Sequence, residues 1–203
     1  MKIFCIGRNY AEHAKELKND IPESPVVFMK PQTALLKDNK PFYLPSFSKE
    51  MHYETELVFR IGKNGKSVQA KYALSYIDAF TVGIDFTARD LQSVCKQKGL
   101  PWEIAKSFDN SAAIGTWLPI NESKDIQDIN FSLLLNGIPV QKGNSKDMLF
   151  SLDKIIAYIS VYFTLQQGDI IFTGTPVGVS SVKIGDVLEA FIEEKSLLKF
   201  EIK

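Results

Sequence analysis

HYETELVFRIG, residues 52–62, is the stretch of this sequence that decides the fold. The apolar and aromatic residues that follow Glu56, and the glycine that closes the run, predict a β-strand. Side chains two apart in a strand share a face, so the carboxylates of Glu54 and Glu56 should lie side by side. Like charges that close repel, and one carboxylate should resist ionisation unless a cation lies between them. On this pair alone, a solvated strand end is the commoner explanation.

A third acid shifts the interpretation towards a metal site. Asp85 ends another apolar run, residues 79–84, immediately before a predicted helix. An acid at such a strand end is placed where sheets present ligands. Three carboxylates without cysteine or histidine suit Mg²⁺, with Mn²⁺ or Ca²⁺ as further candidates. Glu54, Glu56 and Asp85 are therefore the predicted metal ligands.

Composition restricts the class of protein. The chain has 203 residues, 45% of them hydrophobic and 24% charged, as expected for a globular protein. Its formal net charge of +0 shows no excess of positive charge, as nucleic-acid binding would favour. Two cysteines, Cys5 and Cys95, provide no disulfide framework and suit a reducing compartment. No apolar run is long enough for a membrane span or a signal peptide. We expect a cytoplasmic protein with neither nucleic acid nor membrane as partner.

The pattern of elements predicts an α+β, mostly β fold. Many short strand-like runs and few helices, without regular alternation, favour a mixed, mostly antiparallel sheet architecture with flanking helices. Helices are predicted over residues 11–20, from an N-cap at Thr87, and over residues 151–162. Asn136-Gly137 between two apolar runs predicts a β-hairpin. No repeat or linker is visible, so residues 1–203 are expected to form a single domain.

Few other side chains point to chemistry by themselves. His13 and Glu16 are three apart on the first predicted helix and can pair on one face. Such a pair can activate water, although a solvated surface pair is the commoner case. His52 can orient a metal ligand or be purely structural. Lys106 alone indicates nothing, since most lysines are solvated.

The order of motifs along the chain resembles the fumarylacetoacetate hydrolase family. The matching segments are GRNYAEH (7–13), VVFMKP (26–31), HYETEL (52–57), GIDFTARDLQ (83–92), KGLPWEIAKSFD (98–109) and GDIIFTGTPVGV (168–179). They cover nearly the full chain, and their amino-acid sequences are similar to those of the small single-domain branch, which includes acylpyruvases and oxaloacetate decarboxylases. The resemblance implies a mixed β-sandwich roll like the C-terminal domain of fumarylacetoacetate hydrolases, commonly in homodimers.

The resemblance also assigns roles to residues. The family's Mg²⁺ ligands fall on Glu54, Glu56 and Asp85, the same three acids. Its catalytic histidine and glutamate fall on His13 and Glu16, on a lid helix that orders over the substrate. The active-site lysine falls on Lys106, and the substrate contacts fall on Arg8, Lys30, Arg89, Gln92 and Thr175.

The implied activity is Mg²⁺-dependent hydrolysis of the C–C bond of 3-acylpyruvate-type 2-oxo acids through a metal-stabilised pyruvate enolate. His13 with Glu16 would activate water, and Lys106 or Gln92 would stabilise the oxyanion. The alternatives are oxaloacetate decarboxylation and isomerisation or decarboxylation of unsaturated 2-oxo dioates, of the 2-hydroxyhepta-2,4-diene-1,7-dioate isomerase type. A different class also stays open: a metal-free, β-rich binding domain whose acids are solvated.

Overall fold

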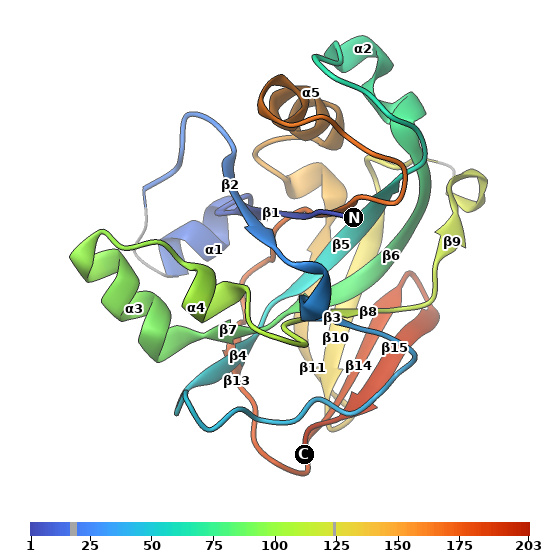
Figure 1. The fold of residues 1–203 in the computed structure, drawn as a ribbon. Helices are drawn as coiled ribbons and strands as arrows, with labels where there is room; N and C mark the ends of the chain where they lie inside the picture. The colour runs from blue at the N-terminus through green and yellow to red at the C-terminus, as the bar shows by residue number, and fades with distance from the viewer. Residues whose placement is uncertain (17–19, 124) are drawn as a thin grey trace.

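A large curved sheet runs through the molecule in the computed structural model, which describes residues 1–16, 20–123 and 125–203 (Figure 1). In those residues the sheet has eight strands. The order is β2 (Val26–Lys30), β1 (Ile3–Gly7), β12 (Ile170–Phe172), β5 (Thr55–Ile61), β6 (Ile77–Asp85), β8 (Ala112–Ile114) and β3 (Leu35–Leu36), with β9 (Leu118–Pro119) beside β6. Only the pairs β1–β12 and β3–β8 are parallel among these strands. The predicted mixed, mostly antiparallel fold is confirmed.

A second sheet of four strands packs against the first. Its order is β11 (Ile138–Asn144), β10 (Asn130–Leu135), β14 (Val187–Ile192) and β15 (Lys195–Glu201), all antiparallel. The predicted hairpin joins β10 to β11, and Asn136 and Gly137 have φ values of 53° and 81°, as a tight hairpin turn requires. Alternate residues of β10, such as Phe131 and Leu133, are buried in the core that the two sheets share. This packing gives the sandwich-like roll.

The predicted strand over residues 52–62 is two strands that belong to different sheets. β4 (Met51–Tyr53) lies in a small sheet between β13 (Ser180–Ser181) and β7 (Thr87–Ala88), whereas β5 lies in the large sheet. The chain changes sheets at Glu54, whose carbonyl accepts a 2.8 Å hydrogen bond from the Asp85 N–H. The break places Glu54 beside the end of β6.

The predicted N-cap at Thr87 is wrong. Thr87 and Ala88 pair with His52 and Met51 as strand β7, so helix α3 (Arg89–Lys98) begins two residues later without a side-chain cap. Because the strand pairing extends through Ala88, the N-cap position falls on Ala88, and the Thr87 hydroxyl donates to the Asp85 carbonyl instead. Helix α3 ends at Gly99, whose φ of 64° is the left-handed conformation typical of a helix C-terminus.

The helices lie in two groups (Figure 1). Helices α1 (Ala11–Glu16), α3 and α4 (Glu103–Lys106) lie on one side, and α2 (Ala70–Ala73) packs against α5 (Leu152–Tyr162) at one end. The helix predicted over 151–162 is thus confirmed; part of the one predicted over 11–20 falls on residues 17–19, outside the described residues. Short 3₁₀ helices cover Gln32–Ala34, Leu74–Tyr76, Ile120–Glu122 and Ser145–Asp147. None of the helices in the described residues has the length and apolar run needed to cross a membrane.

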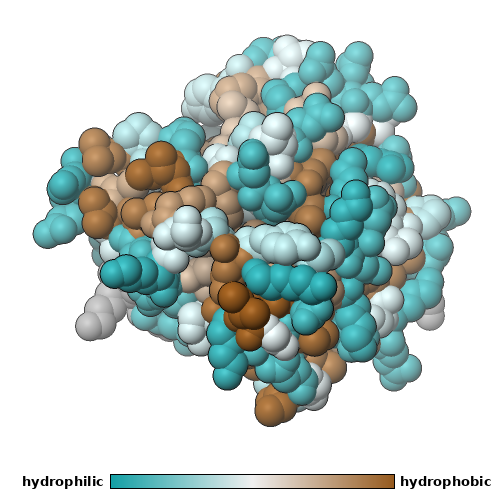
Figure 2. Space-filling model, turned by 60° about the horizontal axis from the view of Figure 1, so that its bottom comes forward, coloured by the Kyte–Doolittle hydropathy of each residue, from teal (hydrophilic) through white to brown (hydrophobic). Residues whose placement is uncertain are grey.

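The surface is mixed in polarity, with hydrophobic side chains gathered over the α3 and α4 side of the molecule (left in Figure 2). Phe47 and Ile104 are 50% and 63% exposed on that side, and together with Leu91, Glu103 and Phe108 they line a groove. That residues 1–203 form a single domain stays a prediction.

Candidate active site

The three predicted metal ligands meet where β5 begins and β6 ends. Glu54 occupies the break before β5, Glu56 lies in β5, and Asp85 is the last residue of β6. All three are buried, with exposed fractions of 6%, 2% and 1%, and one carboxylate oxygen of each lies within 4.8 Å of the others. The acids are therefore not a solvated strand end.

Two of these acids are compensated by buried cations. Lys106 Nζ lies 2.7 Å from Glu54 Oε2 and 2.8 Å from Asp85 Oδ2. Arg89 Nη2 lies 2.5 Å from Glu54 Oε1, and Lys30 Nζ lies 2.8 Å from Asp85 Oδ1. Burial by itself raises the pKa of Glu54, but the charges of Lys106 and Arg89 outweigh it and hold the pKa far below its usual range. Glu54 is thus ionised.

Glu56 is the exception. Among the described residues no ion pair reaches its carboxylate, and the Gly174 N–H donates a 2.7 Å hydrogen bond to Oε2. Burial, followed by repulsion from Asp85 and Glu54, raises the pKa of Glu56 well above its usual value. A cation beside it would reverse this shift.

This donor set fits a divalent ion. Asp85 Oδ1 is buried and has no partner with hydrogen-bond geometry among the described residues, although Lys30 Nζ is within ion-pair distance. Glu56 has no counter-charge of its own. Oxygen-only ligands of this kind are those that Mg²⁺ and Mn²⁺ prefer. Glu54, Glu56 and Asp85 are the residues that would hold the ion.

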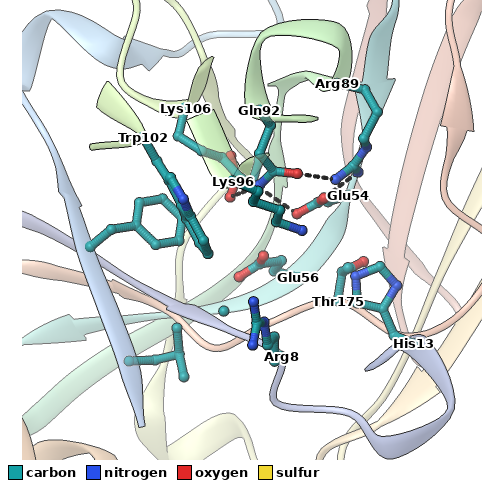
Figure 3. A pocket seen from close by; sticks show the side chains of 14 residues that line it. Arg8, His13, Glu54, Glu56, Arg89, Gln92, Lys96, Trp102, Lys106 and Thr175 are labelled. Atoms are coloured by element: carbon teal, nitrogen blue, oxygen red, sulfur yellow. Dashed lines mark hydrogen bonds and ion pairs between the residues drawn. The ribbon is translucent and has the colours of Figure 1, made fainter. Parts of the chain in front are cut away.

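The acids form one wall of a cavity that gathers most of the predicted site (Figure 3). The predicted residues that line it are Arg8, His13, Glu54, Glu56, Asp85, Arg89, Gln92, Lys106 and Thr175. Glu16 and Lys30 are not among them. The Lys30 ammonium is fully buried and contacts Asp85, the Lys106 carbonyl, and the Ser111 carbonyl and hydroxyl, so it positions the acid and helix α4 from behind.

Lys106 ends the short helix α4 and points its amine between two acids. Burial lowers its pKa, but Asp85 and Glu54 more than compensate, and the pKa is raised. Lys106 therefore stays protonated. Of its three N–H groups two bond to the carboxylates, which leaves one to donate to another oxygen.

Arg89 and Gln92 share one face of α3, as their spacing predicted. Arg89 Nη1 donates to Gln92 Oε1 at 2.6 Å, and Arg89 Nε lies 3.4 Å from His52 Nδ1. Burial and then the charge of Arg89 lower the pKa of His52. The neutral His52 thus contacts Arg89, so it orients the cation beside Glu54 and does not touch the acids.

His13 and Glu16 pair at the mouth of the cavity. His13 Nδ1 lies 3.0 Å from Glu16 Oε2, and Glu16 Oε1 accepts a 3.1 Å hydrogen bond from the Gly178 N–H. Because a carboxylate accepts hydrogen bonds, the tautomer that satisfies this contact carries its hydrogen on Nδ1 and has Nε2 as the ring acceptor. His13 is 6% exposed whereas Glu16 is exposed, so the imidazole is buried and its carboxylate partner lies at the surface.

Thr175 follows the Gly174 backbone that holds Glu56. Gln141 Nε2 donates to Thr175 Oγ1 at 2.9 Å, so the Thr175 hydroxyl hydrogen is free to donate into the cavity. Gln141 Oε1 accepts from the Thr55 N–H, which fixes the strand between the two glutamates. Sequence reasoning missed Gln141, since a lone glutamine on a hairpin strand carries no signal.

Lys96, Trp102 and Phe28 also line the cavity and were not predicted. Lys96 could have been found, because it lies four residues after Gln92 on the same helical face. Trp102 and Phe28 form an aromatic wall, with ring centroids 5.9 Å apart.

One cavity is lined by a buried acid cluster, by Lys106 and Arg89 paired to it, and by His13, an arrangement typical of enzyme sites. The chain matches the family model described as fumarylacetoacetate (FAA) hydrolase C-terminal over residues 2–203. It therefore belongs to the fumarylacetoacetate hydrolase family, as the motifs indicated.

Three relatives show the range of this family. The chain is 39% identical over 201 residues to the mitochondrial oxaloacetate tautomerase FAHD1 of Mus musculus, covering 99% of this chain and 91% of the relative. It is 42% identical over 192 residues to the mitochondrial oxaloacetate decarboxylase of Dictyostelium discoideum, covering 94% and 88%. The crystal structure of fumarylpyruvate hydrolase from Pseudomonas aeruginosa, in complex with Mn²⁺ and pyruvate, has a TM-score of 0.95 at 35% identity and covers 100% of this chain and 89% of that one. The fold prediction is confirmed, and the enzyme class is favoured over a binding domain.

Proposed function

We propose that this protein is a Mg²⁺-dependent hydrolase that cleaves the C–C bond of 3-acylpyruvate-type 2-oxo acids. The observation that carries the proposal is His13, which lines the same cavity as the three acids and contacts Glu16 through Nδ1. Cleavage of an acylpyruvate needs water at the acyl carbonyl, and a histidine whose Nδ1 is held by Glu16 can present Nε2 to activate that water. A decarboxylase has no such need.

The residues of the chain divide the work. A divalent ion at Glu54, Glu56 and Asp85 would supply a Lewis acid for the carboxylate and 2-oxo oxygens of the substrate. Arg89, in contact with Gln92, and the Thr175 hydroxyl would bind and orient the substrate carboxylate.

His13 and Lys106 would act at the acyl end. His13 Nε2 takes a proton from water as the water oxygen bonds to the acyl carbon. The free N–H of Lys106, or the Gln92 amide, donates to the oxyanion. The C–C bond then breaks, its electron pair passes to the pyruvate fragment, and His13 returns the proton. The products are pyruvate and a carboxylic acid.

A second candidate is the conversion of oxaloacetate. The relatives named oxaloacetate decarboxylase and oxaloacetate tautomerase support it. Loss of CO₂ and tautomerisation use the same polarised 2-oxo group but need no water. The isomerisation of unsaturated 2-oxo dioates needs no water either. One site can therefore support these reactions, and the His13–Glu16 pair separates hydrolysis from them.

The test measures pyruvate release from acetylpyruvate and CO₂ release from oxaloacetate, with Mg²⁺ and with a chelator. Hydrolysis is expected to require Mg²⁺ and to fall about 10²–10⁴-fold in His13→Ala. Glu16→Gln should give a smaller loss, since it weakens the orientation of the ring. Decarboxylation should fall much less in both variants. An equal loss of both activities would contradict water activation by His13, and metal-independent turnover would contradict the role of the acids.

The homodimer and the cytoplasmic location also belong to this proposal. The apolar groove that contains Phe47 and Ile104 is the surface that would pair in a dimer. Sedimentation of the protein should give a dimer, and Ile104→Lys should shift it towards the monomer. A monomer at all concentrations would contradict the prediction.

A further inference from the structure

Gln141 is a buried side chain that the proposed mechanism does not use. It lies in β11 of the four-stranded sheet, is 3% exposed, and is not one of the residues that line the cavity. Its amide bonds to both segments of the site: to the Thr55 N–H between the two glutamates, and to the Thr175 hydroxyl and the Pro176 carbonyl. One side chain thus joins the strand of candidate metal ligands to the loop that faces the substrate.

The partners of this amide fix which way it is turned. The Thr55 N–H can only donate, so it faces Oε1 at 2.9 Å, and the Pro176 carbonyl can only accept, so it faces Nε2 at 2.9 Å. The reversed amide would put a donor against a donor and an acceptor against an acceptor. Nε2 is therefore also the group that faces Thr175 Oγ1, at 2.9 Å, and it donates to that oxygen.

This contact decides what the Thr175 hydroxyl can do. A hydroxyl can rotate its one hydrogen, so a threonine without neighbours can either donate or accept. Because Nε2 approaches as a donor, a lone pair of Oγ1 faces Gln141 and the hydrogen points away from it. Thr175 is 2% exposed, lines the cavity together with His13 (Figure 3), and donates to no acceptor among the described residues. The hydrogen is left pointing into the cavity.

Gln141 also holds the backbone around that hydroxyl. Pro176 lies two residues before Gly178, whose N–H donates to Glu16 at 3.1 Å. A Cβ added to Gly178 would lie 3.3 Å from Gln141 Cγ, so the side chain packs against that backbone. The amide thus sets where Thr175 lies between the acid strand and helix α1.

We propose that Gln141 is a positioning residue that makes the Thr175 hydroxyl a fixed hydrogen-bond donor to an oxygen of the substrate. This inference rests on the proposed function, in which Thr175 binds the substrate carboxylate. An ionised carboxylate can only accept, so a hydroxyl whose hydrogen already points into the cavity matches it without reorientation. Gln141 acts through Thr175, since it does not itself line the cavity.

The experiment is a double-mutant cycle read by binding. The dissociation constant of pyruvate, a product of the proposed hydrolysis, is measured by calorimetry with Mg²⁺ in the wild-type and in the Thr175→Val background. Thr175→Val removes the hydroxyl and keeps the shape of the side chain. Gln141→Met removes the amide. Lys142→Met is the matched control, because Lys142 is exposed and is the next residue of β11, on the opposite face of the strand.

A second substitution, Gln141→Glu, reverses the polarity of the contact. It keeps the oxygen that accepts from the Thr55 N–H and replaces the NH₂ group by an oxygen. In either ionisation state that oxygen carries at most one hydrogen, so it cannot donate to both Pro176 and Thr175. The Thr175 hydroxyl is then drawn towards the new carboxyl group and away from the substrate.

Thr175→Val should raise the dissociation constant about 10- to 100-fold, as expected for a lost hydrogen bond to a charged group. Gln141→Met should raise it about 3- to 10-fold, because the hydroxyl then samples three staggered orientations and the unpaired Pro176 carbonyl competes for its hydrogen. Gln141→Glu should raise it more than Gln141→Met does, although it is the closer match in shape. Lys142→Met should leave it unchanged.

In the Thr175→Val background, Gln141→Met should change the dissociation constant by less than about 2-fold, and the loss from Gln141→Glu should shrink several-fold. In turnover of acetylpyruvate, both Gln141 variants should raise KM with a smaller change in kcat, because the carboxylate contact is made alike in the ground state and the transition state.

Two results would overturn the inference while the proposed function stands. One is a loss from Gln141→Met that is equal in the two backgrounds, as a purely structural role requires, and the other is wild-type affinity in both Gln141 variants. Where Gln141→Met does not fold, the cycle with Gln141→Glu, which keeps the bond from the Thr55 N–H, decides in the same way. If the wild type binds pyruvate but turns over neither acetylpyruvate nor oxaloacetate, the proposed function fails and the cycle still decides the role of Gln141. A wild type that binds no pyruvate with Mg²⁺ would overturn both.

Discussion

Replacing each of the two glutamates of β5 by glutamine should change the stability of the metal-free protein in opposite directions. Both residues are buried ligand candidates two positions apart, and glutamine preserves size and one accepting oxygen. Glu54→Gln removes the counter-charge of Lys106 and Arg89, at 2.7 Å and 2.5 Å. Glu56→Gln removes a carboxylate that has no ion pair in the described part of the chain and keeps the hydrogen bond from the Gly174 N–H.

The magnitudes follow from burial and charge. Breaking a buried ion pair by removing one partner costs about 3–5 kcal/mol, which for a chain of this size lowers Tm by roughly 6–20 °C. All three groups of the Glu54 cluster are less than 10% exposed, so solvent screening does not reduce this figure much. Glu56→Gln should raise the free energy of unfolding instead.

The gain from Glu56→Gln should grow with pH. The folded state holds the Glu56 proton to a higher pH than the unfolded chain does, because burial and the neighbouring Asp85 and Glu54 raise its pKa. The stability of the wild type is therefore full below the unfolded pKa of about 4.3 and falls as pH rises towards the folded pKa. Within that window the difference between Glu56→Gln and the wild type should widen by about 1.4 kcal/mol per pH unit.

The assay is chemical or thermal unfolding of the wild type and both variants across pH, first with a chelator and then with excess Mg²⁺. Mg²⁺ at 100 times its dissociation constant should stabilise the folded state by about 2.7 kcal/mol, and only the wild type should gain this stabilisation in full. Equal destabilisation by both substitutions in the chelator would refute the charge assignment. A pH-independent difference would refute the raised pKa of Glu56.

Two further predictions concern the support of the site. Lys106→Met leaves two buried carboxylates without their shared cation, so it should lower the free energy of unfolding of the metal-free protein by about 3–5 kcal/mol. Excess Mg²⁺ should restore more stability to this variant than it adds to the wild type. Unfolding with and without Mg²⁺ measures the difference, and an equal response of the two proteins to Mg²⁺ would contradict the prediction. Gly174→Ala should destabilise the protein by about 2–5 kcal/mol, since φ is 100° and a Cβ would lie 2.8 Å from Asn9 Cβ. The control Gly99→Ala, with φ 64° and no atom within 4 Å of the added Cβ, should cost about 1 kcal/mol. Equal losses in thermal unfolding would show that the close approach to Asn9 is unimportant.

Local pattern was sufficient for much of the site. Alternation along one strand predicted that Glu54 and Glu56 share a face, and helical spacing predicted that Arg89 and Gln92 do, and the structure has both arrangements. It was insufficient where two distant segments pair. The strand predicted over residues 52–62 changes sheets at Glu54, and Thr87 lies in a strand instead of capping a helix. Both differences arise because Met51 and His52 pair with Ala88 and Thr87, and neither local sequence indicates its partner.

The sequence by itself determined the family, the mostly β fold and the identity of the three acids, because these depend on periodicity and on motifs that stand in a fixed order. Only the tertiary structure decided how charge is distributed among them. Whether a carboxylate is paired depends on side chains brought from far along the chain, as Lys106 is brought to Glu54. Glu56, without an ion pair in the described part of the chain, is a consequence of that three-dimensional arrangement, which spacing along the chain does not encode.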